Sequence, residues 1–196
     1  MPTGSAQNCC AQQTPAGKWY NNTMLYKVVK YGDPILRQKL KPTDFEVLRP
    51  ILPQLLQDME ETCLAVHGVG LAANQIGLDY RLALILIPQS DKKDAPLKRV
   101  VIINPEFIDK QGEIVEEEGC LSLPGLWVEI PRATDVTIKC LNEKGEAVKI
   151  RARGLLAKAI QHEMDHLEGH LFIDHADPAL KPAIKKEIKK LRPEWD

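Results

Sequence analysis

Apolar residues recur at intervals of three and four in two long stretches of the chain, which predicts two amphipathic helices. The first helix is predicted over residues 51–66. The second is predicted over residues 155–168, with Gly169 following as a typical terminating residue. A third helix, rich in lysine, is predicted over residues 178–191. The apolar positions of the first stretch are Leu48, Leu52, Leu55, Leu56, Met59, Cys63 and Val66.

Short runs of aliphatic and β-branched residues predict the strands. Those at 81–87 and 100–103 are bounded by prolines and aspartates and are predicted to be buried. Residues 128–130, 135–141 and 147–151 alternate between apolar and polar positions, and the turn at 142–145 joins the last two as a hairpin. Because strands and helices are segregated rather than regularly alternating, we expect a single-domain α+β fold with mostly antiparallel sheets around a central helix.

The amino-acid composition excludes some classes of protein. Of 196 residues, 44% are apolar and 27% are charged, and 26 basic residues nearly cancel 27 acidic ones, which disfavours broad electrostatic binding of nucleic acid. Residues 1–23 have no apolar period and are predicted to be a flexible or non-native tail before a domain spanning 24–196. No apolar stretch reaches the roughly 20 residues of a membrane span, and no signal peptide opens the chain, so we expect no membrane association.

The number and spacing of the cysteines indicate whether the protein works in an oxidising or a reducing compartment. There are five, an odd number at irregular spacing, which is not typical of a secreted disulfide framework. We therefore expect no disulfide partner and a reducing, cytoplasmic location. The five are Cys9, Cys10, Cys63, Cys120 and Cys140.

The run His162-Glu163-Met164-Asp165-His166 lies inside the second predicted helix. A spacing of four places both imidazoles on one helix face, close enough for one metal ion to bridge them. The alternative is an amphipathic helix with two incidental, partly buried histidines. A catalytic metal site has three protein ligands and one open position. Whether the two histidines belong to such a site therefore depends on finding a third ligand.

The third ligands that metalloproteases use do not fit this chain. In the metzincin pattern Gly169 is in place, but Phe172 occupies the position of the third histidine and His170 comes two residues too early. A downstream glutamate would have to be Glu187, which lies in the lysine-rich helix. Cys120 is the stronger candidate, because a turn-rich segment presents it and a thiolate with two imidazoles holds Zn²⁺ or Fe²⁺. It could equally be a small core residue.

A third segment, GVGLAANQ at 68–75, has small residues that allow close backbone approach and a side-chain amide at Gln75, although alone it also fits a tight connection. Together with EGCLS (118–122) and QHEMDH (161–166), it resembles the peptide deformylase family, whose signatures GxGxAAxQ, EGCxS and QHExDH occur in this order. Every fixed position is filled. The resemblance extends to Gly32–Arg37 and covers about residues 24–175.

The resemblance implies a hydrolase that removes the N-formyl group from the initiator formyl-methionine of nascent polypeptides and releases formate. It implies one Fe²⁺ per chain held by Cys120, His162 and His166, with Zn²⁺, Ni²⁺ or Co²⁺ able to substitute. A metal-bound water would be the nucleophile, and Glu163 would accept and return its proton. The resemblance gives the Gln75 side-chain amide and the Leu121 backbone N–H as donors to the oxyanion.

Substrate contacts are predicted around the same helix. Leu155 and Ala159 precede His162 on its own face and, with Val69, would line an apolar pocket for the methionine side chain; alternatively, they are core residues. Val69, Gly70 and Gly119 resemble the family's backbone contacts that hold the peptide extended, like an added strand.

Two further expectations concern charged residues. Asp165 is predicted to face away from the metal and to pair with Arg132, or else to be a solvated carboxylate. The basic helix at 178–191 is either a solvated surface or a ribosome contact. The competing functions are a zinc endopeptidase and a noncatalytic metal- or ribosome-binding module, and the presence of both Glu163 and Gln75 disfavours the latter.

Overall fold

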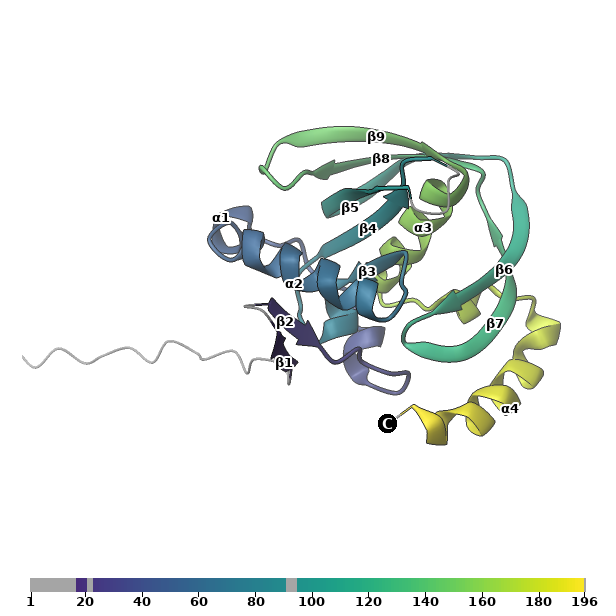
Figure 1. Ribbon diagram of the computed structural model, residues 1–196. Coiled ribbons are helices and arrows are strands. Elements are labelled where there is room, and N and C mark those ends of the chain that lie inside the picture. Colours follow the sequence, from purple (N-terminus) through teal and green to yellow (C-terminus); the bar gives the residue numbers. More distant parts are fainter. Residues whose placement is uncertain (1–16, 21–22, 91–94, 196) are drawn as a thin grey trace, which may run out of the picture.

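The computed structural model describes residues 17–20, 23–90 and 95–195 (Figure 1). Its helices are α1 Phe45–Leu48, α2 Leu52–Ala65, α3 Gly154–Glu168 and α4 Lys181–Leu191. Short 3-10 helices are η1 Pro34–Arg37, η2 Ala73–Ile76, η3 Phe172–His175, η4 Pro178–Leu180 and η5 Arg192–Glu194. The strands are β1 Gly17–Tyr20, β2 Thr23–Tyr26, β3 Gly70–Ala72, β4 Leu82–Pro88, β5 Leu97–Gln111, β6 Ile114–Cys120, β7 Leu123–Arg132, β8 Asp135–Leu141 and β9 Ala147–Arg153.

The strands pair antiparallel within three sheets. The largest has the order β3-β4-β5-β8-β9, while β6 pairs with β7 and β1 pairs with β2. Residues 82–86 in β4 are buried without alternation, because α2 packs against one face of the sheet and α3 against the other. The expected single-domain α+β architecture with antiparallel sheets is confirmed.

Helix α3 occupies the centre of the molecule (Figure 1). Its apolar face packs on the largest sheet, and each buried isoleucine, leucine or methionine side chain there contributes about 1.5–3 kcal/mol. The helix ends at Gly169, whose φ of 77° is the left-handed conformation that closes helices. An alanine Cβ at this position would lie 2.6 Å from the Arg37 carbonyl oxygen. The packed side chains are Ala157, Ile160, Met164 and Leu167 from α3 with Ala83, Ile85, Ile102 and Ile138 from the sheet.

The β6–β7 hairpin and α4 lie on the side of α3 away from α2 (Figure 1). A third apolar cluster joins this hairpin to η3 and α4, through Leu123, Ile130, Phe172, Ile184 and Ile188. Near the end of the chain, the indole of Trp195 donates a hydrogen bond of 2.9 Å to the Pro124 carbonyl oxygen. The hairpin is thereby held against η3, α4 and the end of the chain.

Most predicted elements are found with small shifts in their ends. The helices at 51–66 and 155–168 correspond to α2 and α3, and the strand at 135–141 is β8. The strand predicted at 100–103 is much longer, because β5 continues past Pro105 through irregularities in its pairing with β8. The prediction for 178–191 is split between η4 and α4. Strand β6 was not predicted, since its run of glutamates is not typical of a strand.

Strand β1 lies within the segment predicted to be a tail and was not expected there. The rest of that segment, apart from Thr23 in β2, lies outside the described residues, as do Cys9 and Cys10, so the role of residues 1–23 stays a prediction. Cys63, Cys120 and Cys140 are free thiols. Within the described part of the chain, no helix combines the length and apolar character needed to cross a membrane.

Candidate metal centre

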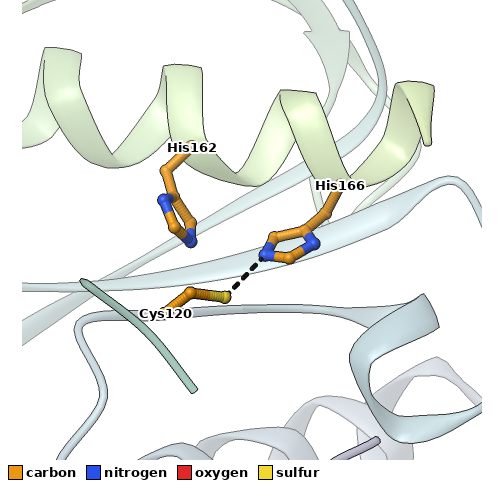
Figure 2. A group of neighbouring side chains, drawn as sticks. All are labelled: Cys120, His162 and His166. Carbon is orange, nitrogen blue, oxygen red and sulfur yellow. Dashed lines mark hydrogen bonds between the residues drawn. The ribbon is translucent and has the colours of Figure 1, made fainter. Parts of the chain in front are cut away.

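Three potential metal ligands meet where the end of β6 faces α3 (Figure 2). His162 and His166 are one helical turn apart on α3. Cys120 is the last residue of β6, and the pairing register between β6 and β7 shifts just before it. One donor atom from each residue lies within 4.8 Å of the others, and the Cys120 Sγ is 3.2 Å from the His166 Nε2. The two histidines spaced four residues apart and Cys120, which the sequence suggested as ligands, therefore form a set of three donors that could hold one metal ion.

The charge state of Cys120 suits a metal ligand. Burial raises the pKa of this thiol, but the neighbouring His166 and His162 lower it more, and the net pKa is well below the ordinary value. A thiolate is the form of cysteine that binds metals. Cys63 is different: burial, with a smaller contribution from Glu163, raises its pKa to about 12, so this thiol stays protonated.

A chain of hydrogen-bonded charged groups orients the His162 ring through its Nδ1 atom. Its Nδ1 lies 2.6 Å from Oε1 of Glu118, and donation to this carboxylate leaves Nε2 free for a metal. Arg132 donates to both oxygens of Glu118, at 2.9 and 2.6 Å, and to Oδ2 of Asp165 at 2.6 Å. Asp165 also contacts Nε2 of His175 at 2.9 Å. The Arg132–Asp165 ion pair is confirmed, whereas the part played by Glu118 was missed.

Glu118 is ionised despite being 5% exposed. Burial raises the pKa of this carboxyl, but hydrogen bonds from Arg132 and His162 outweigh the burial and hold the pKa at about 2. The acidic run at 116–118 gave no sign of this in the sequence, because the partner arginine comes from the adjacent strand β7.

Glu163 has the properties of an acid/base group next to this donor set. Its side chain is 3% exposed, and Oε2 has no hydrogen-bond partner among the described residues. Burial raises the pKa of this carboxyl to about 7, although His162 and His166 oppose the rise. An unpartnered carboxylate oxygen with a pKa near neutrality fits proton exchange with a water on a metal held beside it.

Gln75, one of the two predicted oxyanion donors, lies on η2 with its amide directed at the site. Its Nε2 is 3.5 Å from the Cys120 Sγ and 3.3 Å from the Ser122 hydroxyl, while its Oε1 accepts from the Ala72 N–H. Asn74, from the same short helix, donates to the backbone carbonyl of His166 at 2.6 Å. The GVGLAANQ segment therefore packs directly against both the cysteine segment and the histidine helix.

A cavity of about 650 Å³ opens beside these residues. All the predicted substrate-binding positions line it, and Leu155 and Val69 are 49% and 42% exposed, so neither is a core residue. Ala159 is 8% exposed and belongs both to the cavity wall and to the core. Other residues of the wall were not predicted, since no motif marks them: Lys30, His67, Trp127 and Lys158. The predicted lining residues are Val69, Gly70, Gln75, Gly119, Cys120, Leu121, Leu155, Ala159, His162 and Glu163.

Comparisons with known proteins agree with one another. The family model described as polypeptide deformylase matches residues 25–181. The peptide deformylase of Elusimicrobium minutum is 59% identical over 171 residues, which cover 86% of this chain and 97% of that protein. A crystal structure of a peptide deformylase from Legionella pneumophila has a TM-score of 0.76 at 38% identity, covering 86% of this chain and 96% of that one. The Thermus thermophilus peptide deformylase structure has a TM-score of 0.75 at 34% identity, covering 87% and 99%.

Proposed function

The chain belongs to the polypeptide deformylase family and removes the N-formyl group from nascent polypeptides, and from this premise we propose which of its residues carry the reaction. Cys120, His162 and His166 hold one metal ion. Their donor atoms lie within 4.8 Å of one another, and this convergence is the observation that carries the proposal. When bound, the ion supplies Lewis acidity that lowers the pKa of a coordinated water toward neutrality.

Glu163 moves the proton. It accepts a proton from the attacking water and delivers it to the departing amine, which needs a carboxyl that exchanges protons near neutral pH. Its burial and its pKa of about 7 support this role. The unpartnered Oε2 supports it as well, because neither a protein hydrogen bond nor an ion pair has to be broken for the transfer.

Gln75 and Leu121 stabilise the oxyanion that forms when the formyl carbon is attacked. The Gln75 Nε2 is directed into the site at the Cys120 sulfur, and Leu121 follows Cys120 in the chain. With Oε1 held by the Ala72 N–H at 2.9 Å, the amide is oriented before substrate binds, and such preorganised donors favour the transition state.

Substrate lies in the cavity with its methionine side chain against Val69, Leu155 and Ala159. The two exposed aliphatic side chains and the small Ala159 leave an apolar space that suits an unbranched thioether. The backbone of Gly70 and Gly119 pairs with the extended peptide, whose chain runs as an added strand.

One assay tests these assignments. Formate release from formyl-Met peptides should fall by about 100- to 10,000-fold in Glu163→Ala. Glu163→Gln, which keeps the shape of the side chain, should be equally impaired. Glu187→Ala removes a partly exposed carboxylate of α4, which pairs with Lys190 on the surface, and serves as the matched control, with wild-type activity expected. Metal content is measured on every variant, so that loss of the ion is not mistaken for loss of the base.

Wild-type protein that is loaded anaerobically with Fe²⁺ and releases no formate would overturn the proposal. Cleavage within N-acetylated peptides would instead indicate the zinc endopeptidase, the rival enzyme class. Metal binding without any hydrolysis would indicate a noncatalytic module.

We propose Fe²⁺ as the ion used in the cell, with Zn²⁺, Ni²⁺ and Co²⁺ as substitutes. One thiolate with two imidazoles is a donor set of intermediate softness that accepts all four ions. Metal analysis of protein purified without oxygen tests this assignment, and a preparation that is fully active with stoichiometric zinc and no iron would contradict it.

We propose that α4 contacts the ribosome and that the enzyme works in the cytoplasm, where formyl-methionyl chains are made. Lys181, Lys185 and Lys189 follow one another at a spacing of four, and in the described residues none has a carboxylate within ion-pair distance. Reversing the three charges to glutamate is preferable to deleting the helix, because Ile184 and Ile188 are buried in the core. Unchanged co-sedimentation of this triple variant with ribosomes would dispose of the contact.

A further inference from the structure

The extended segment at residues 28–31 connects two separate walls of the metal centre. The Val29 N–H donates to the backbone carbonyl of Gln75 at 2.7 Å, and the Tyr31 N–H donates to the carbonyl of Ser122 at 2.8 Å. Between them, Lys30 is partly buried and lines the same cavity as the metal ligands. This lysine belongs to none of the three signatures.

The ammonium group of Lys30 contacts one particular peptide unit. Its Nζ donates to the carbonyl oxygen of Leu121 at 2.9 Å. That oxygen belongs to the peptide that joins Leu121 to Ser122, and the N–H of the same peptide donates to the Cys120 Sγ at 3.4 Å. A single planar amide is therefore held by a cation at its oxygen and by the ligand sulfur at its nitrogen.

This arrangement strengthens the contact to sulfur. A positive charge on a carbonyl oxygen polarises the amide and makes its N–H a better donor, as in other chains of hydrogen bonds at low dielectric. In the described part of the chain no carboxylate lies within ion-pair distance of Lys30, so its charge acts on Leu121 without a competing partner. Burial lowers the pKa of Lys30, and the nearby Cys120 opposes the shift.

We propose that Lys30 is a positioning residue for the metal ligand Cys120, acting through the Leu121–Ser122 peptide. By strengthening the N–H···S hydrogen bond, Lys30 reduces the electron donation from the thiolate to the ion and keeps the ion a stronger Lewis acid. It also fixes the segment whose Leu121 N–H faces the oxyanion. The inference rests on the proposed function, because it requires Cys120 to be a ligand.

The test compares Lys30→Met, Lys30→Arg and the control Lys27→Met. Lys27 is an exposed lysine just before this segment. Among the described residues no hydrogen bond from its side chain reaches the centre, so the control matches the loss of one positive charge. The readouts are the Ser122 amide proton resonance in the zinc-loaded protein, the thiolate-to-cobalt charge-transfer band in the cobalt-loaded protein, and kcat and KM separately.

In Lys30→Met we expect the Ser122 amide proton to move upfield and the charge-transfer band to move to longer wavelength, because the sulfur lone pairs are less stabilised. We expect kcat to fall by about tenfold with KM within twofold, the lower end of what outer hydrogen-bond partners of metal ligands contribute. Lys30→Arg should retain most of the wild-type values, and Lys27→Met should retain all of them.

If neither the charge-transfer band nor the Ser122 amide resonance moves in Lys30→Met, the proposed role of Lys30 is wrong, whatever happens to kcat. If Lys30→Met does not fold, Lys30→Gln keeps a neutral donor, and the same two spectra decide. A wild-type cobalt protein without any thiolate charge-transfer band would overturn the assignment of Cys120 as a ligand, and this inference with it.

Discussion

Gly70 has no room for a side chain, and we expect Gly70→Ala to disable the enzyme by displacing Glu163. A Cβ at position 70 would lie 2.3 Å from the Glu163 Oε1 and 2.9 Å from its Cδ, where real contacts are at least 3.0 Å. The carboxylate must therefore move by at least 0.7 Å, the difference between 3.0 and 2.3 Å. Misplacing a reacting group by about 1 Å costs on the order of 100-fold in rate, or about 2.7 kcal/mol.

The assay is a double-mutant cycle on formate release. Gly70→Ala alone should lower kcat by about 100-fold, with a loss of stability of only about 1–3 kcal/mol from crowding. In a Glu163→Ala background the clashing atoms are gone, so adding Gly70→Ala should change the residual activity by less than twofold. A further 100-fold loss in that background would contradict this prediction, because the effect would then not pass through Glu163.

Three other predictions concern the site and the core beside it. Gln75→Ala should lower kcat by about 100- to 1000-fold with little change in KM, and steady-state kinetics showing only a raised KM would rule out the oxyanion role. Arg132→Met removes the cation shared by the buried Glu118 and the partly buried Asp165, which keep only their histidine contacts, and urea unfolding should show a loss of about 3–5 kcal/mol; a loss below about 1 kcal/mol would contradict their stabilisation by Arg132. Cys63 is fully buried and its pKa is raised to about 12, so iodoacetamide at about pH 8 should label it only after unfolding, as peptide mapping can check.

The donor set was predictable because it depends on local geometry and on short motifs. A spacing of four residues on a helix brings His162 and His166 together in any regular helix, and α3 is regular. Cys120 was less certain, since periodicity does not distinguish a ligand from a small core residue. The structure brings its sulfur to the histidines, and the resemblance had pointed to the same residue.

What could not be predicted depends on partners distant in the sequence. Glu118 and Arg132 are separated by 14 positions and become neighbours only in the β6–β7 hairpin, which was not predicted as a pair of strands. Lys30 and Leu121 are 91 positions apart. Periodicity was also ambiguous for Leu155, which lies on the histidine-bearing face of α3 and borders the cavity rather than the core.

The hydrogen-bond chain from His175 through Asp165, Arg132 and Glu118 to His162 is made entirely of protein groups. Its interactions do not require an ion, and neither do the apolar contacts that hold α3. His162 is therefore oriented by protein groups alone, and we expect that ions of similar size and ligand preference can replace one another without refolding the chain. On this view, we expect the choice among ions that suit one thiolate and two imidazoles to depend on the supply of metal ions rather than on selectivity of the scaffold.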